Sequence, residues 1–266
     1  MNWGKMKTLF IYLFVALNAV LLTFYIYTVQ KNKTEIVQEK EIIERSMKND
    51  NITVEENATK RDNLGYVNVT ISDLKDIRKE DSGLKYEVEN VDKTSTLKVS
   101  SENAITNVNK GSYRAELDSF LLEKMKLSAN YIFSSYNSSK NEVIFEQQID
   151  SFRVFSNKNA RIVFSVENNG DIKNFTLTSV SNIRKDKNEA LVPSSQAINR
   201  LYHEDLIPKN CRVRTTLGYY TYISQTENQV LIPTWNVEIS DKDGQISNYY
   251  VDAINLNVLN RKGHSS

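Results

Sequence analysis

Hydrophobic residues follow different patterns at the two ends of this chain. From Thr8 to Val29 they form an unbroken run, TLFIYLFVALNAVLLTFYIYTV, with no charged residue. A helix needs roughly 20 such residues to cross a bilayer. The run therefore predicts a transmembrane helix over residues 9–29, preceded by a short tail at residues 1–8 and followed by a long polar region.

The apolar run has two readings, a retained anchor or a cleaved signal peptide. A signal peptide has an apolar core of about 7–15 residues before a small-x-small cleavage site. This run is longer, and its one candidate site, residues 16–19, lies in the middle. We expect the segment to be retained. Lys5 and Lys7 precede it, which favours a cytoplasmic N-terminus and places the bulk of the chain on the extracytoplasmic side of the cell membrane.

Aromatic and basic residues flank the run where the membrane interface should lie. Amphipathic rings and lysines are typical of this region. The residues predicted to lie at the interface are Trp3, Lys5, Lys7, Tyr25 and Tyr27.

Asn18 is the one strongly polar residue at the middle of the predicted span. It is either a tolerated single amide or a group that hydrogen-bonds to a partner helix. The residues that we expect to contact a partner helix are Asn18, Leu13, Leu17, Leu21 and Tyr25.

Residues 30–49 are good helix formers and predict a stalk helix that continues from the membrane. Val29, Ile36 and Ile43 fall seven residues apart. This spacing leaves open a short coiled coil with a partner or with a second copy, as a homodimer.

Beyond the stalk, short segments with period-two alternation predict strands. Helical spacing predicts two amphipathic helices, one from about Ser112, as N-cap, to Leu127, and one from Pro193 to about Leu206. Asn-Gly in residues 168–171 predicts a hairpin with a type I′ turn, and residues 241–244 join the last two strands. This order predicts an α+β class with mainly antiparallel sheets. We expect two α+β subdomains, residues 50–129 and 130–260, and a disordered tail at residues 261–266.

Composition narrows the function. With 34 basic and 33 acidic residues the net charge is +1, which disfavours nucleic acid as a partner. Cys211 is the single cysteine, so the chain has no internal disulfide. An extracytoplasmic domain without disulfides is more typical of Gram-positive bacteria than of eukaryotic secretion.

Catalytic and metal-binding patterns are weak. His203 is followed by Glu204 and Asp205, without the second histidine of a helical zinc peptidase, and His264 lies in the C-terminal tail. Residues 241–244 resemble the start of a calcium loop, but their glycine is at position four rather than six. We expect no enzyme activity, no cofactor and no metal. The alternative that stays open is an extracytoplasmic envelope enzyme or cell-wall polymer binding factor.

Two motifs carry a resemblance to a known family. The opening MNWGKxKTLFI at residues 1–11 resembles the start of YycI-type regulators, and LIPTWxV at residues 231–237 with YVDA at 250–253 is similar to their last hairpin. The resemblance implies auxiliary control of the cell-wall sensor histidine kinase WalK of Gram-positive bacteria, with no enzymatic activity. It also implies a membrane complex with a sister regulator of YycH type, formed partly through transmembrane helices.

Overall fold

A computed structural model describes residues 3–55, 61–75, 83–91, 94–127, 130–221, 226–260 and 264–265. Within the first helix, the side chains of Lys5 and of residues 29–40 lie outside this description. The range 29–40 includes Val29 and Ile36 of the predicted coiled-coil seam. The chain divides into two units, Met1–Thr53 and Val54–Ser266.

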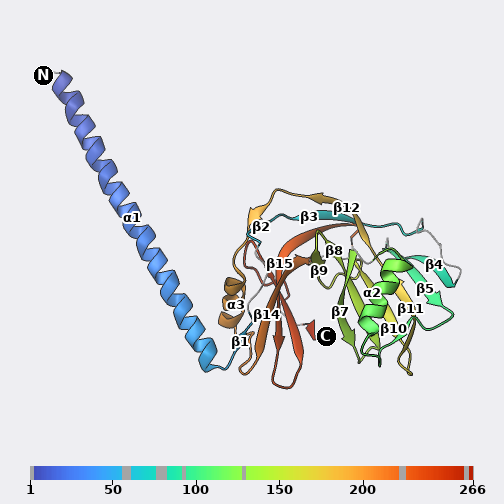
Figure 1. Cartoon of the computed structure of the whole chain (residues 1–266). Coiled ribbons are helices and arrows are strands. Elements are labelled where there is room, and N and C mark those ends of the chain that lie inside the picture. The colour runs from blue at the N-terminus through green and yellow to red at the C-terminus, as the bar shows by residue number, and fades with distance from the viewer. Residues whose placement is uncertain are drawn as a thin grey trace. The chain divides into compact units, whose positions relative to one another are not determined.

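Helix α1 (Trp3–Asn49) makes up nearly all of the first unit (Figure 1). Its sequence contains no proline, and its only glycine is Gly4 in the first turn. At 1.5 Å per residue the helix is about 70 Å long. It ends in a Schellman motif: Asn51 has φ of 56°, and the N–H of Ile52 donates to the carbonyl of Met47 at 2.9 Å.

Beyond α1, the described residues contain two helices and seventeen strands. The helices are α2 (Tyr113–Glu123) and α3 (Ser194–His203). The strands are β1 (Thr53–Val54), β2 (Asn63–Leu64), β3 (Val67–Ile71), β4 (Leu84–Val91), β5 (Thr94–Ser101), β6 (Thr106–Asn107), β7 (Tyr131–Asn137), β8 (Glu142–Ile149), β9 (Phe152–Val154), β10 (Arg161–Val166), β11 (Asp171–Leu177), β12 (Val180–Lys185), β13 (Glu189–Ala190), β14 (Arg212–Tyr220), β15 (Asn228–Ser240), β16 (Ile246–Asp252) and β17 (His264–Ser265).

Most strands belong to one hydrogen-bonded network with the order β12-β3-β15-β14-β9-β8-β10-β11-β5-β4. Nearly all neighbours are antiparallel, and β9 and β14 are a parallel pair. Strands from either side of residue 129 pair directly, for example β5 with β11 and β3 with β12. The predicted class is confirmed: an N-terminal apolar helix, mainly antiparallel sheet and two amphipathic helices.

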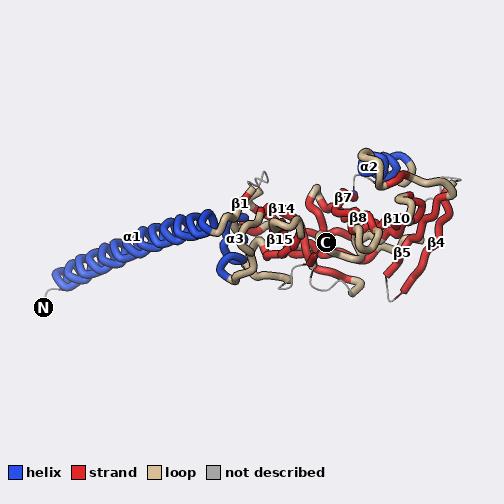
Figure 2. The backbone as a smooth tube through the Cα atoms, turned by 90° about the horizontal axis from the view of Figure 1, so that it is seen from below, coloured by secondary structure: helices blue, strands red, loops and turns tan. Residues whose placement is uncertain are grey.

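Helix α2 covers one face of the β4-β5-β11-β10-β8-β7 part of the network (Figure 2). Leu117 and Leu121 on the helix are fully buried against Phe145, Phe164 and other apolar strand residues. The opposite face pairs polar residues across the strands, with Glu146 beside Arg161 and Lys98 beside Glu87. An antiparallel sheet with one covered face shows this alternation of apolar and polar positions.

Helix α3 packs on the β14–β15 part of the network through Ala197, Ile198 and Leu201 (Figure 1). Trp235 in β15 is buried, and its indole Nε1 donates to the carbonyl of Val192 at 2.9 Å, which ties the segment before α3 to the sheet. The other face carries polar residues such as Asn236, and also an apolar group that includes Tyr220, Ile232 and Tyr250.

Two local predictions need correction. The hairpin at residues 168–171 forms, but Gly170 alone has a positive φ (88°), whereas a type I′ turn needs two such residues. Gly170 N–H donates to Glu167 O and Glu167 N–H to Asp171 O, both at 2.8 Å. The hairpin therefore has a three-residue loop, in which a type I turn is followed by one left-handed glycine. Asn169 keeps a negative φ.

Ser112 occupies the N-cap position of α2, but its hydroxyl does not cap a backbone N–H. Ser112 Oγ instead donates to Glu116 Oε1 at 2.6 Å, and Thr106 Oγ1 donates to Glu116 Oε2 at 2.6 Å. These hydrogen bonds lower the pKa of Glu116. The helix ends at Glu123, earlier than predicted, and Lys126 beyond it has φ of 55°.

Gly218 lets two strands approach closely, because β14 pairs with β9 at Gly218 and Arg153. A Cβ at Gly218 would lie 2.4 Å from Arg153 O and 2.5 Å from Phe155 Cε2. We therefore expect Gly218→Ala to lower the free energy of unfolding by about 1 to 3 kcal/mol through overpacking. Urea unfolding followed by tryptophan fluorescence measures it. The control is Gly111→Ala, where a Cβ meets no atom within 4 Å; equal losses in the two variants would contradict this account.

Candidate membrane helix and polar cleft

The apolar part of α1 has no protein around it. Met6–Thr28, 23 residues, is long and apolar enough to cross a membrane, and none of it is buried within the structure. At 1.5 Å per residue it spans about 35 Å, close to the thickness of a bilayer's hydrocarbon core. Its large side chains, such as Phe10 at 63% and Phe24 at 69%, expose most of their surface. The helix is a candidate single-pass membrane anchor.

The predicted partner-contact residues lie on a broad stripe of α1. Residues four apart on a helix are offset by about 40°, so the apolar members spread over about 120° of its circumference. They are 56–67% exposed: Leu13, Leu17, Leu21 and Tyr25. Asn18 lies about 20° from Tyr25 and about 140° from Leu13, at one border of the stripe.

Asn18 satisfies part of its amide within its own helix. Its Nδ2 donates to the backbone carbonyl of Phe14 at 2.8 Å. Thr23 and Thr28 bond in the same way to the carbonyls of Ala19 and Phe24. An amide has two N–H groups and one carbonyl. The Asn18 bond with Phe14 therefore leaves one N–H and Oδ1 for a neighbouring helix.

At the membrane interface, Lys7 Nζ lies 5.6 Å from the centre of the Trp3 ring, a cation–π contact in the first turns of α1. Tyr25 and Tyr27 are 67% and 63% exposed near the other end of the apolar segment. The side chain of Lys5 lies outside the described residues.

The second unit contains a polar cleft of about 620 Å³. One wall is β7, the floor comes from β8, β9 and Ser156, and the other wall is the polar face of β15 and β16. The cleft forms because each sheet buries only one face beneath its helix, and the polar faces of the two parts remain open. No pattern in the sequence predicts this cleft.

Glu146 organises the floor of this cleft. The residue is only 7% exposed. Ser134 Oγ donates to its Oε2 at 3.1 Å, the N–H of Ser156 donates to its Oε1 at 2.8 Å, and Arg153 Nε lies 3.7 Å from Oε2. Burial raises the pKa of Glu146, although Arg153 and the hydrogen bonds oppose this shift. The carboxylate holds β7, β8 and β9 together.

The network continues into the other wall. Ser156 Oγ and Tyr250 Oη share a hydrogen bond of 2.7 Å. The ring of Tyr250 stacks between Phe155 and Tyr220, with centroids 5.6 Å and 4.6 Å away. Burial raises the pKa of the Tyr250 hydroxyl strongly. Tyr250 is only 4% exposed, so its ring offers no flat platform to a sugar.

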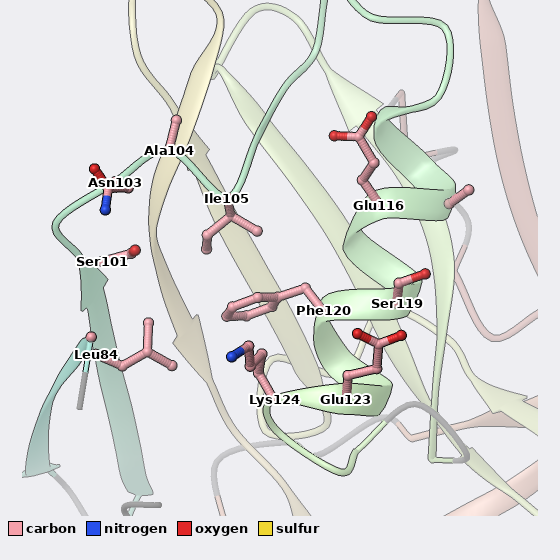
Figure 3. Close-up of a pocket in the computed structure, with 12 residues that line it drawn as sticks. Leu84, Ser101, Asn103, Ala104, Ile105, Glu116, Ser119, Phe120, Glu123 and Lys124 are labelled. Carbon is pink, nitrogen blue, oxygen red and sulfur yellow. The ribbon is translucent and has the colours of Figure 1, made fainter. Parts of the chain in front are cut away.

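A second groove, of about 520 Å³, lies between α2 and the ends of β4 and β5 (Figure 3). Phe120 points from α2 towards Ile105 and Leu84, while Glu123 and Lys124 lie farther along the helix. Glu116 at the upper end is held by Ser112 and Thr106. The carboxylate of Glu116 therefore serves to stabilise the start of α2.

The two histidines lie on different elements, His203 at the end of α3 and His264 in β17. Among the described residues that line the cleft and the groove, none is a histidine. Among the described residues, no group of three His, Cys, Asp or Glu could hold a metal ion.

The sequence profile of the YycI protein family matches residues 30–254 of this chain. The chain belongs to the YycI family. This confirms the resemblance to the YycI family, and the matched range includes the motifs at residues 231–237 and 250–253. The YycI match begins after the apolar segment and extends almost to the end of the second unit.

Solved structures and curated sequences add little to the YycI assignment. The chain is similar to an uncharacterised protein from Eubacterium rectale, at 8% identity over 79% of this chain and 90% of that one, with a TM-score of 0.47. It is also similar to the YpeB C-terminal domain of Bacillus megaterium, at 12% identity over 86% and 96%, with a TM-score of 0.44. Curated protein sequences give no match.

Glu146 titration should be visible in the stability of this YycI protein. An ordinary glutamate has a pKa of about 4.3, and that of Glu146 is raised in the fold. The carboxyl of Glu146 makes its full contribution to the free energy of unfolding at a pH below its pKa in the unfolded chain. This contribution is lost as the pH rises through its pKa in the folded protein. We compare the free energy of unfolding of the natural protein with that of Glu146→Gln. The difference, natural protein minus variant, should fall as the pH rises, by about 1.4 kcal/mol for each unit by which folding raises the pKa of Glu146.

Urea unfolding between about pH 4 and pH 8 tests this. Glu87→Gln, at an exposed position on the same sheet, controls for the loss of one negative charge. A difference for Glu146→Gln that is constant or grows with pH would contradict the assignment.

Proposed function

We propose that this protein is a single-pass membrane regulator of a WalK-type sensor histidine kinase, acting by protein–protein contacts and not by catalysis. Its N-terminus lies in the cytoplasm and its second unit is extracytoplasmic. The observation that carries the proposal is the YycI match over residues 30–254, joined to an apolar helix that no part of the described chain covers. A sister regulator of YycH type is the second expected partner.

The proposed mechanism uses α1. A regulator shifts a two-state kinase only if it binds the two states with different free energies. Packing of the Leu13–Tyr25 stripe against kinase spanning helices supplies such a contact, and Asn18 adds a directional hydrogen bond at its border. Hydrogen bonds between membrane helices average about 0.6 kcal/mol. Asn18 therefore adjusts an interaction that helix packing largely provides.

Membrane topology is tested by cysteine labelling. Cys211 is 6% exposed and should not react in the folded protein. We expect Ser138→Cys, in the exposed turn between β7 and β8, to react with a membrane-impermeant maleimide on intact cells. Lys7→Cys should react only after permeabilisation. Labelling of Lys7→Cys on intact cells, or recovery of the chain free in the medium, would contradict the proposal.

Helix-mediated regulation is tested at Asn18. We expect Asn18→Leu to weaken association with the kinase about two- to threefold, because one interhelical hydrogen bond is lost. Kinase-dependent transcription should change with it. The matched control is Thr23→Val, which removes a hydroxyl bonded to its own helix about 140° around the axis from Asn18.

A two-hybrid assay with α1 intact, and with residues 9–29 replaced by an unrelated apolar helix, measures the whole contribution of the span. Loss of kinase binding supports contact through the helix. Unchanged binding and unchanged transcription in all variants would move recognition to the second unit.

A further inference from the structure

Strand β7 is an edge strand protected only by a register shift between Phe133 and Ser135 in its pairing with β8. In the described part of the chain it pairs only with β8. Its sequence, YIFSSYN, contains no charged residue and no proline. The edge strand β4 carries Lys85, Glu87 and Glu89, and the edge strand β12 ends in Arg184 and Lys185. Charges of this kind prevent pairing with another chain. Their absence leaves β7 able to accept a further strand.

The polar cleft runs along this edge. Five consecutive residues of β7, Phe133 to Asn137, line it. Successive side chains of a strand point to opposite faces. Beyond the irregularity at Phe133–Ser135, the adjacent residues Tyr136 and Asn137 point to opposite faces and both line the cleft, which places the cleft beside the strand. Phe133 O accepts a hydrogen bond from Arg153 Nη2 at 3.0 Å, which shows that polar groups reach this backbone from within the cleft.

The lining of the cleft has one more basic than acidic side chain: Arg114, Arg153 and Arg161 against Glu146 and Glu238. Glu146 accepts hydrogen bonds from Ser134 and Ser156 and lies near Arg153. Glu238 lies 4.0 Å from Arg214, which has a closer partner in Glu55 at 2.7 Å. Arg161 lies beside Glu146 across the strands, and the Arg114 guanidinium sits 4.2 Å from the centre of the Phe133 ring. Within the residues that the structure describes, neither Arg114 nor Arg161 has a carboxylate within 4.0 Å.

Asn236 supplies a further unused group. Its Oδ1 is buried in the cleft wall and accepts no hydrogen bond within the described structure. Buried acceptors nearly always have a donor. Because this atom is buried, a backbone N–H of an incoming segment reaches it only if the side chain of Asn236 turns into the cleft.

We propose that the cleft binds an extended acidic peptide segment of a partner protein by strand addition to β7. Backbone hydrogen bonds to β7 give the affinity, and carboxylates of the peptide pair with Arg161 and Arg114. The covered ring of Tyr250 disfavours a saccharide in the same place. This contact is separate from α1 and gives the second unit its own means of recognising a partner.

The test uses the full chain in nanodiscs and a random heptapeptide library displayed on phage. We expect enrichment of peptides that combine β-branched or aromatic residues with Asp or Glu. Arg161→Glu should weaken the binding of these peptides about tenfold or more, since a charge-assisted hydrogen bond becomes a repulsion. Arg184→Glu changes the net charge equally on exposed β12, outside the cleft, and should leave binding unchanged.

Hydrogen exchange locates the contact. An enriched peptide should slow exchange of β7 amides, and Ser135→Pro, which removes one N–H from the edge, should weaken binding. If Ser135→Pro does not fold, the Arg161→Glu comparison and the exchange pattern decide. Replacing residues 9–29 by an unrelated apolar helix should not alter peptide binding, so this test and the test of the proposed function can fail independently.

Any of the following results would overturn the proposal: no enriched peptide, enrichment that is unaffected by Arg161→Glu, protection of amides elsewhere than in β7, or a dimer of this chain joined through β7. Binding of polyglycerol phosphate without binding of any peptide would assign the cleft to an anionic polymer and also overturn it.

Discussion

Apolar side chains cover the surface of α1 along its first half, and water is a poor solvent for them. Burying such a side chain is worth about 1.5 to 3 kcal/mol, and none of the Met6–Thr28 segment is buried by protein. A helix satisfies its own backbone hydrogen bonds, so hydrocarbon can surround it without further cost. The Met6–Thr28 segment is therefore a candidate single-pass membrane anchor.

The second unit follows a different constraint. Each part of its strand network buries one face beneath a helix, Leu117 and Leu121 on one side and Ile198 and Leu201 on the other. The faces left open are polar because alternate residues of each strand point away from the core. Where these faces meet, Glu146 links three strands, and arginines lie near the edge strand β7. The charged cleft is a consequence of the way the cores are covered.

The buried carboxylate of the cleft has a structural role. Glu146 is held by a serine hydroxyl, a backbone N–H and Arg153. These contacts tie three strands together. Two recognition surfaces, one in the membrane and one outside it, would allow a regulator to hold a complex while biasing its signalling state.

The sequence alone determined the apolar helix, the α+β class, both amphipathic helices and the family, because each depends on residues that are close in the chain. It predicted the hairpin at Gly170 but not its turn type, and the position of Ser112 but not the partner of its hydroxyl. The cleft was not predictable. Glu146, Arg161 and Asn236 are distant in sequence, and only strand register brings them together, since a shift by one residue would turn every side chain to the opposite face.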